Sequence, residues 1–387
     1  MDVNIQELLL DGPALDPESA TLLKDCLGKK RNLVSLQIRD LDFIHDSSGS
    51  GLHPVVHLAN GIASNGGLKK LCLECCNIDS PGWIVMMEMV QDHKSLASIR
   101  IGRMMISMKQ LLTILQNIRA NPRIRELGFH SMKLPGKGMP DIAAFLAGNS
   151  SLENLQLVNV RLDSSSGCLI ARALMSNTTL TALNLAANRL GRKFATACRQ
   201  LLEYNNHLEI LNLSENELTD RGAEALANGL RKNQKLAVLC LETNGIKERG
   251  GLAIASMLAL NSSLTELPME NNPCGEKAGA AISVSLETNT TLACMSNDNC
   301  GFADRDREFI ESITTRNARA CASRKRDALL LSRHGPGSAS WLPPEAGALV
   351  MHYLLMQSAT SDQYESVATE MELAMNALAH LAKDKPS

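Results

Sequence analysis

The sequence has few aromatic residues, no dominant charge and no long apolar run. Aromatic residues make up 3% of the 387 positions, and the formal net charge at pH 7 is -2. No apolar stretch approaches the roughly 20 residues that cross a bilayer. The first residues, MDVNIQELLLDG, lack the basic and apolar parts of a signal peptide. Binding to nucleic acid, insertion in a membrane and secretion are therefore not expected.

The cysteines are scattered and odd in number. There are 11 of them, whereas a secreted disulfide framework usually has an even, clustered set. Cys72 and Cys75 form a C-x-x-C pair. A structural zinc site usually takes its other two ligands from a second pair, and none follows at a suitable spacing. We expect free thiols, a reducing cytoplasmic location, no metal and no cofactor.

One phrase, L-x-x-L-x-L-x-x-N-x-L, recurs along most of the chain. Its copies start 28 residues apart, with a single interval of 35 that accommodates the loop-like stretch HDSSGSG at 45–51. Self-similarity at such a period indicates a solenoid. The first apolar residues of the copies are Ile5, Leu33, Leu68, Leu96, Ile124, Leu152, Leu180, Leu208, Leu236, Leu264 and Leu292.

Each period predicts one strand followed by one helix. The phrase alternates apolar and polar residues, as a half-buried strand does. An apolar pair follows 18 and 22 residues after most starts, for example Ile170 and Leu174, and in the interrupted repeat the pair is Leu58 and Ile62. Four-residue spacing places both side chains on one face of a helix. Neither element buries its apolar face alone, so neighbouring repeats must stack.

This pattern resembles that of leucine-rich-repeat proteins, and the 28-residue period with a full helix is similar to the ribonuclease-inhibitor-like subfamily. The resemblance covers about 5–316. It implies an α/β horseshoe solenoid with a parallel β-sheet on the concave face and α-helices on the convex face. We expect a leucine-rich-repeat domain of about eleven repeats over 1–316 and a helical C-terminal extension or cap over 317–387.

Two asparagine positions recur within the period. The resemblance implies that the ninth residue of the phrase bonds the backbone of adjacent turns, as an asparagine ladder. Earlier repeats carry other residues there, and we expect their turns to be less regular. The ladder residues are Asn188, Asn216, Asn244 and Asn272.

A second asparagine lies three residues before most repeat starts. Asn177 begins a glycosylation sequon, but Asn205 and Asn233 hold the same position without one. The position therefore selects asparagine and not the sequon. We expect a structural role, with a left-handed backbone that caps the preceding helix.

Charged residues on the expected concave face are distributed unevenly. We interpret this face as a docking surface for a partner protein with a basic patch. The alternative is an ordinary solvated surface. The acidic residues, in the C-terminal half, are Glu215, Glu242, Glu266, Glu270 and Asp298. The basic residues, in the N-terminal half, are Arg39, Lys70, Arg100 and Arg103.

After the repeats, the sequence predicts a long helix over 304–333 and further helices over 341–355 and 361–383. These helices are expected to cap the open end of the solenoid. Within 341–355, the stretch LPPEAGALVMHYL resembles the first helix of an F-box, which implies recruitment of a ubiquitin-ligase adaptor. Short helical tails of this kind also resemble those of bacterial effectors that are delivered into a host cell.

The sequence as a whole favours a monomeric, non-enzymatic scaffold that binds a protein. The alternative is a substrate receptor of a ubiquitin ligase, or an effector, that acts through the C-terminal helices.

Overall fold

The computed structural model describes residues 5–12, 14–30, 32–43 and 53–332, with side chains as far as Cys321. All of them fall in one compact unit, Met1–Gly335. The stretch 45–51 and the helices expected over 341–355 and 361–383, including the F-box-like segment, lie outside the described residues.

The strands form a nine-stranded parallel sheet in the order β1-β3-β5-β6-β7-β8-β9-β10-β11. Equivalent residues of successive repeats face each other, so that Lys70, Ser98, Glu126 and Asn154 form one row across the sheet. A second pair, β2 (Ala14–Leu15) and β4 (Asp42–Phe43), forms a small sheet. The nine strands are β1 (Glu7–Asp11), β3 (Ser35–Arg39), β5 (Lys70–Glu74), β6 (Ser98–Gly102), β7 (Glu126–His130), β8 (Asn154–Val158), β9 (Ala182–Asn184), β10 (Ile210–Asn212) and β11 (Val238–Cys240).

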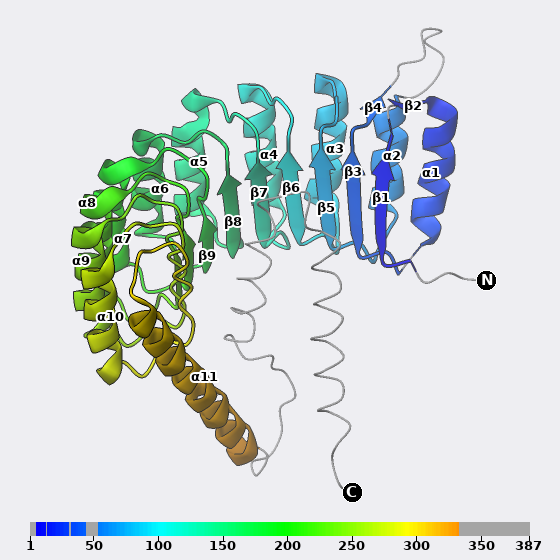
Figure 1. Ribbon diagram of the computed structural model, residues 1–387. Helices are drawn as coiled ribbons and strands as arrows, with labels where there is room; N and C mark the ends of the chain where they lie inside the picture. Colours follow the sequence, from blue (N-terminus) through cyan, green and yellow to red (C-terminus); the bar gives the residue numbers. More distant parts are fainter. Residues whose placement is uncertain (1–4, 13, 31, 44–52, 333–387) are drawn as a thin grey trace, which may run out of the picture. The chain divides into compact units, whose positions relative to one another are not determined.

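A layer of helices covers one face of the sheet (Figure 1). The predicted apolar pairs are confirmed as the inward face of these helices, and Ile170 and Leu174 are 0% and 1% exposed. No helix of the described part of the chain has both the length and the apolarity to cross a membrane. The helices are α1 (Pro17–Lys29), α2 (Pro54–Ala63), α3 (Ser80–Asp92), α4 (Met108–Ala120), α5 (Met139–Gly148, after the 3-10 turn Gly136–Gly138), α6 (Ser164–Leu174), α7 (Gly191–Tyr204), α8 (Thr219–Leu230), α9 (Glu248–Leu258) and α10 (Glu276–Thr288).

The expectation that the earlier repeats are less regular is wrong. Strands β1, β3 and β5 to β8 have five residues each, whereas β9, β10 and β11 have three. Beyond β11, the sheet continues as isolated bridges from Val238 to Glu266 and from Glu266 to Cys294. Pro268 contributes to this change. It lies two residues after Glu266, at a position equivalent to a strand residue of the other repeats, and it has no N–H to donate to the neighbouring strand.

From the second repeat onward, the chain turns with the same backbone geometry at the eighth position of the phrase. From Asp40 to Asn299 these residues are left-handed, with φ between 51° and 58°. Arg103 and Glu215 occupy this position. The turn therefore depends little on whether the next residue is asparagine, and this explains why the early repeats remain regular.

The ladder asparagines connect consecutive turns. Asn188 Nδ2 donates to Leu157 O of the preceding repeat at 2.7 Å and to Leu185 O of its own at 2.9 Å. Asn188 Oδ1 accepts from the N–H of Leu162 at 3.0 Å. At the same position Cys300 donates its thiol to Met269 O. The side-chain amide thus satisfies buried backbone groups, and asparagines 216, 244 and 272 make equivalent bonds.

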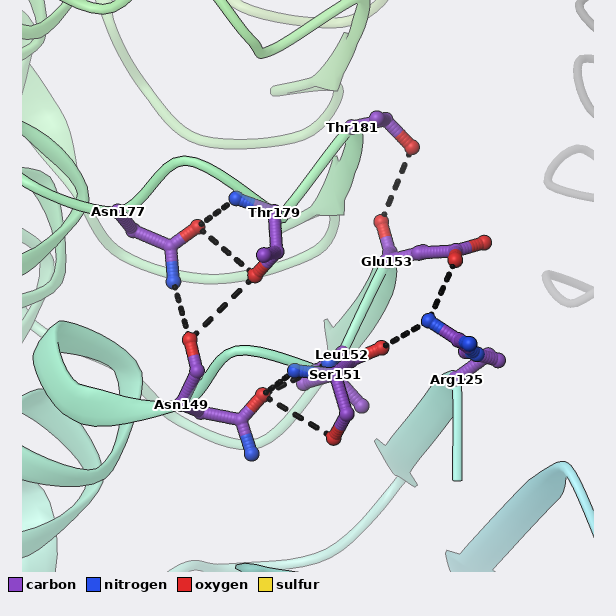
Figure 2. Close-up of polar contacts among 8 residues, drawn as sticks. All are labelled: Arg125, Asn149, Ser151, Leu152, Glu153, Asn177, Thr179 and Thr181. Atoms are coloured by element: carbon purple, nitrogen blue, oxygen red, sulfur yellow. Dashed lines mark hydrogen bonds and ion pairs between the residues drawn. The ribbon is translucent and has the colours of Figure 1, made fainter. Parts of the chain in front are cut away.

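The second set of asparagines bridges the opposite ends of the repeats. Asn177 Nδ2 donates to Asn149 O at 3.3 Å, and its Oδ1 accepts from Thr179 N at 3.0 Å (Figure 2). The same amide also donates to Leu146 O at 2.7 Å and accepts from Leu180 N at 2.8 Å. The expected left-handed backbone is wrong. Asn149, at the equivalent position, has φ -86° and ψ 134°. The side-chain amide, and not the backbone, explains the choice of asparagine.

The long helix predicted from residue 304 is confirmed as α11 (Asp304–Ser332). Its first turns pack against α10, with Ile310 fully buried. Asn317 Nδ2 donates to Asn289 O and Leu292 O, each at 3.0 Å, so this helix continues the asparagine bridge of the repeats. The expected domain boundary between 316 and 317 lies inside this continuous helix.

Candidate binding site on the sheet face

The third, fifth, seventh and eighth positions of the phrase form the surface of the sheet that lies opposite the helices. We call it the sheet face; it is the surface that the repeat pattern predicts to be concave. Side chains alternate between the two faces of a strand, so Leu71 and Leu73 of β5 are buried beneath it while Lys70, Cys72 and Glu74 lie on it.

In the N-terminal half of the sheet face, basic residues are paired with acids on neighbouring strands. Arg100 donates from Nε and Nη2 to Glu126 Oε1 at 2.9 and 2.7 Å, and Gln156 Nε2 donates to the same oxygen at 3.0 Å. Arg39 Nε lies 3.8 Å from Glu74 Oε2. Arg100 is thus hydrogen-bonded to Glu126, whereas Arg39 makes only an ion contact, and its Nε has no hydrogen-bond partner among the described residues.

Lys70 and Arg103 are both exposed. The structure therefore separates the four expected basic residues into a paired set and an exposed set.

Glu74 also contacts a residue two strands away. His130 Nε2 lies 3.2 Å from Glu74 Oε1, and the Cys72 thiol lies 3.6 Å from the same oxygen. His130 reaches Glu74 across Gly102 of β6, where a Cβ atom would lie 2.1 Å from His130 Cε1. Sequence reasoning missed this cluster. The signal that could have found it is a glycine between Glu74 and His130 at the same position of three successive repeats.

The cluster changes the acidity of its members. The hydrogen bond from His130 lowers the pKa of the Glu74 carboxyl. Burial, together with the charge of Glu74, raises the pKa of the Cys72 thiol to about 12. At neutral pH Cys72 is therefore a protonated thiol and a poor nucleophile.

The C-terminal half of the sheet face is acidic. Glu242 and Glu266 are 8% and 4% exposed, and burial raises the pKa of each to about 7. The Ser214 hydroxyl donates to Glu242 Oε2. Glu242 Oε1 and Glu270 Oε2 have no hydrogen-bond partner among the described residues.

The expected acidic residues do not all lie in one environment. Burial, together with the charges of Glu242, Glu266 and Glu270, raises the pKa of the Cys240 thiol, which lies at a sheet-face position of the repeat that carries Glu242, beside the repeat that carries the other two. Glu215 and Asp298 are exposed and lie at the eighth and seventh positions of their repeats. The site thus consists of the buried Glu242 and Glu266, the half-buried Glu270 and the exposed Glu215 and Asp298.

The two halves of the sheet face therefore differ in charge compensation. The repeats that begin at Leu180 and continue through Leu292 carry no lysine, arginine or histidine at sheet-face positions. Among the described residues, no basic side chain of the sheet face pairs with Glu242 or Glu270, in contrast to Glu74 and Glu126.

Comparisons with known proteins find leucine-rich-repeat families. A family model described as "TMOD/LMOD Leucine-rich domain" matches residues 192–320, and one described as "Leucine Rich repeat" matches residues 176–193. No curated protein sequence matches the chain.

Solved structures to which the chain is similar include the following two. One is described as "Leiomodin-1 Actin-Binding Site 2 (ABS2)", with 23% sequence identity and a TM-score of 0.39, covering 42% of this chain and 95% of that chain. The other is a tropomodulin C-terminal domain from Caenorhabditis elegans, with 16% identity and a TM-score of 0.38, covering 43% of this chain and 99% of that chain.

The fold is a leucine-rich-repeat solenoid. The stacked strand-helix units, the parallel sheet and the matching family models all define this class.

Proposed function

We propose that the chain is a non-enzymatic scaffold that binds a partner protein through the acidic C-terminal half of its sheet face. The observation that carries the proposal is the contrast in charge compensation. Arg100 is bonded to Glu126 within the sheet, whereas oxygens of Glu242 and Glu270 have no hydrogen-bond partner among the described residues. A basic segment of a partner supplies the cations that this half of the sheet lacks.

The buried carboxyl groups link binding to pH. The pKa of Glu242 and that of Glu266 are both about 7. A lysine or arginine of the partner favours the ionised carboxylate and lowers these pKa values on binding. Protons are then released, so the affinity increases as the pH rises from about 6 to about 8.

The experiment captures partners with the full chain as bait in the native host and then measures the dissociation constant of a purified partner. Because one of the similar structures is described as an actin-binding site, purified actin is included as one probe. Replacing the exposed Glu215 and Asp298 with lysine should weaken binding about tenfold or more and make the loss dependent on salt.

The matched control carries the same charge change away from the sheet face. Glu276 and Glu287 are exposed residues of α10, and their replacement with lysine should alter the dissociation constant by less than about twofold. Equal losses in both double variants, or no loss in either, would contradict docking on the acidic half of the sheet face.

The absence of catalysis is part of this proposal and concerns, among the cysteines, two buried thiols. Burial raises the pKa of Cys198 to about 12, as it does for Cys72, so neither thiol is an activated nucleophile. The proposal also includes a monomeric state and a reducing cytoplasmic location. It includes membership of the ribonuclease-inhibitor-like subfamily as well, and all three rest on the sequence.

The ubiquitin-ligase alternative rests on the F-box-like stretch alone. Replacing Leu342 and Leu354 with aspartate in the full chain tests it, because an F-box helix binds its adaptor through spaced apolar residues. Loss of a cullin-ligase adaptor from the captured proteins would favour the alternative. Capture of the adaptor by both chains, or by neither, would reject it.

A further inference from the structure

Three side chains of types that bind metals meet in the N-terminal half of the sheet face. They are Cys72 and Glu74 of β5 and His130 of β7. The Glu74 Oε1 atom lies 3.6 Å from Cys72 Sγ and 3.2 Å from His130 Nε2, and the three ligand atoms all lie within 4.8 Å of one another. This half of the surface is separate from the acidic half to which the proposed function is assigned.

The distances match the edges of a zinc coordination tetrahedron. Zinc bonds of about 2.3 Å to sulfur and about 2.0 Å to nitrogen and oxygen give edges of about 3.5 Å between sulfur and oxygen and about 3.3 Å between nitrogen and oxygen. The observed separations of 3.6 and 3.2 Å lie close to both values. The third edge, between Cys72 Sγ and His130 Nε2, is at most 4.8 Å, against about 3.5 Å in such a tetrahedron, so two of the three edges match an ion at this position.

The backbone holds the ligands in this arrangement. Cys72 and Glu74 are two residues apart on one strand, so their side chains leave the same face. His130 lies on the second strand along, and it reaches Glu74 only because Gly102 between them has no side chain. The second oxygen of Glu74 lies 3.8 Å from Arg39 Nε, an ion contact without a hydrogen bond.

The surrounding charges leave room for a cation. Arg100, which flanks Cys72 on β6, is engaged by Glu126 through two N–H groups. On binding a divalent ion the Cys72 thiol gives up its proton to solvent, and the resulting thiolate and the Glu74 carboxylate supply two negative charges beside the Arg39 guanidinium, whose Nε lies 3.8 Å from Glu74 Oε2. The thiolate favours zinc over magnesium or calcium, because those ions prefer oxygen ligands.

We propose that Cys72, Glu74 and His130 form a zinc-binding site on the sheet face. Three protein ligands leave one position of the tetrahedron for water or for a side chain of a bound protein. The C-x-x-C pair in the sequence points to the wrong second cysteine, because the ligands that complete the site are Glu74 and His130 and not Cys75.

Cobalt(II) and zinc(II) test the proposal on the full chain, reduced and freed of metal. One equivalent of cobalt should give the visible absorption of a tetrahedral ion with a thiolate-to-cobalt charge-transfer band, and zinc should displace it. Cys72→Ser should abolish the charge-transfer band. His130→Gln should weaken binding at least about tenfold.

Gly102→Ala provides the sharper variant, because it keeps all three ligands. The new Cβ overlaps the His130 ring, so binding should weaken as in His130→Gln. Cys75→Ser, beside the site, and Cys26→Ser, an exposed cysteine in α1, serve as matched controls that should leave the affinity within about twofold. Thermal unfolding in chelator shows whether each variant folds, and only folded variants are compared.

The site is rejected if the full chain binds no cobalt, or if Cys72→Ser, His130→Gln and Gly102→Ala all retain the wild-type affinity. The second outcome would assign the bound metal to other cysteines of the chain.

Discussion

His130 Nε2 lies 3.2 Å from Glu74 Oε1, although β6 separates the strands that carry these two residues. The contact exists because β6 presents Gly102 at the equivalent position, where a Cβ atom would collide with the His130 ring. It lowers the pKa of Glu74. The glycine on β6 thus allows residues of β5 and β7 to contact each other across it.

Replacing Gly102 with alanine should displace His130 and return the pKa of Glu74 toward its ordinary range. Folding lowers the pKa of Glu74 from 4.5. The contact therefore stabilises the folded protein fully above pH 4.5, and this stabilisation is lost as the pH falls through the folded pKa. We expect a loss of up to about 1 kcal/mol at pH 7 that shrinks below about pH 4. Urea unfolding in chelator at both pH values measures it.

The control for this variant is Gly136→Ala, since no atom lies within 4 Å of a Cβ at Gly136. A loss in Gly102→Ala that is the same at both pH values would show that Glu74 is not its source.

Replacing Glu242 with glutamine should stabilise the protein at alkaline pH. The folded pKa of about 7 lies above the ordinary 4.5, so the stability that the protonated carboxyl contributes is complete below pH 4.5 and is lost as the pH rises through 7. At about pH 8.5 the wild type holds a buried charge that the variant lacks, and the gain should be on the order of 1–3 kcal/mol.

Denaturant unfolding at about pH 4.5 and about pH 8.5 measures the Glu242 effect. Glu215→Gln, at an exposed position of the neighbouring repeat, should show no such gain. A stabilisation of Glu242→Gln that is equal at both pH values would contradict desolvation of the carboxylate as its cause.

His93 occupies the position that asparagine holds in the neighbouring repeats. Its Nε2 lies 3.1 Å from Ile62 O, and its Nδ1 accepts from Leu96 N at 3.1 Å. Both contacts are satisfied by the neutral tautomer with the proton on Nε2. A second proton would face the Leu96 N–H, and burial lowers the pKa of the imidazole below its ordinary value.

His93→Asn should therefore remove part of the acid sensitivity of the fold. The unfolded chain takes up the proton first, so the stability that depends on neutral His93 is present above the ordinary pKa of 6.5 and is lost as the pH falls below it. Thermal unfolding between about pH 8 and pH 5 should show a flatter dependence in the variant. The exposed His207→Asn should keep the wild-type slope, and identical slopes in all three proteins would refute the role of His93.

The regular parts of the fold could be predicted because each depends on local periodicity. Pairs such as Ile170 and Leu174 lie four residues apart, and a helix is the conformation that brings both to one face. The ladder residue Asn188 was found in the same way, by register.

The candidate site could be predicted only as a set of positions. The sequence places Glu242 on the sheet face but not its burial, which depends on the packing of neighbouring repeats. The contact of His130 with Glu74 joins residues 56 positions apart, and it requires both the register and the size of the residue between them. The left-handed backbone predicted for the bridging asparagines is wrong for a related reason. Their side chains stabilise the fold through hydrogen bonds to the preceding repeat, which the local sequence does not reveal.

Ala187 provides a test of the left-handed turn. Its φ is 56°, a conformation that costs an alanine roughly 1–2 kcal/mol and that glycine adopts freely. Ala187→Gly should therefore stabilise the protein by about 0.5–1 kcal/mol, after the larger entropy loss of glycine on folding is included. Ala186→Gly, one residue earlier and not left-handed, should destabilise it by a similar amount. Chemical denaturation compares the two, and a loss in both variants would contradict a strained turn.

Asn177 allows the structural and the glycosylation readings of its sequon to be separated. Asn177→Asp and Thr179→Ala each destroy the sequon, but only the first removes the Nδ2 group that donates to Leu146 O and Asn149 O. Because Asn177 is 4% exposed, the aspartate variant should lose about 2–4 kcal/mol of unfolding free energy.

Thr179→Ala should cost less than about 1 kcal/mol, because the hydroxyl of Thr179 makes only long contacts, at 3.4 and 3.5 Å (Figure 2). Denaturant unfolding of protein produced without glycosylation measures both variants. The same amide that would carry a glycan is buried in the bridge between repeats, so a folded chain cannot hold both. Equal stability of the two variants would show that the hydrogen bonds of the Asn177 amide do not stabilise the fold. The recurrence of asparagine at this position would then not be explained by these bonds.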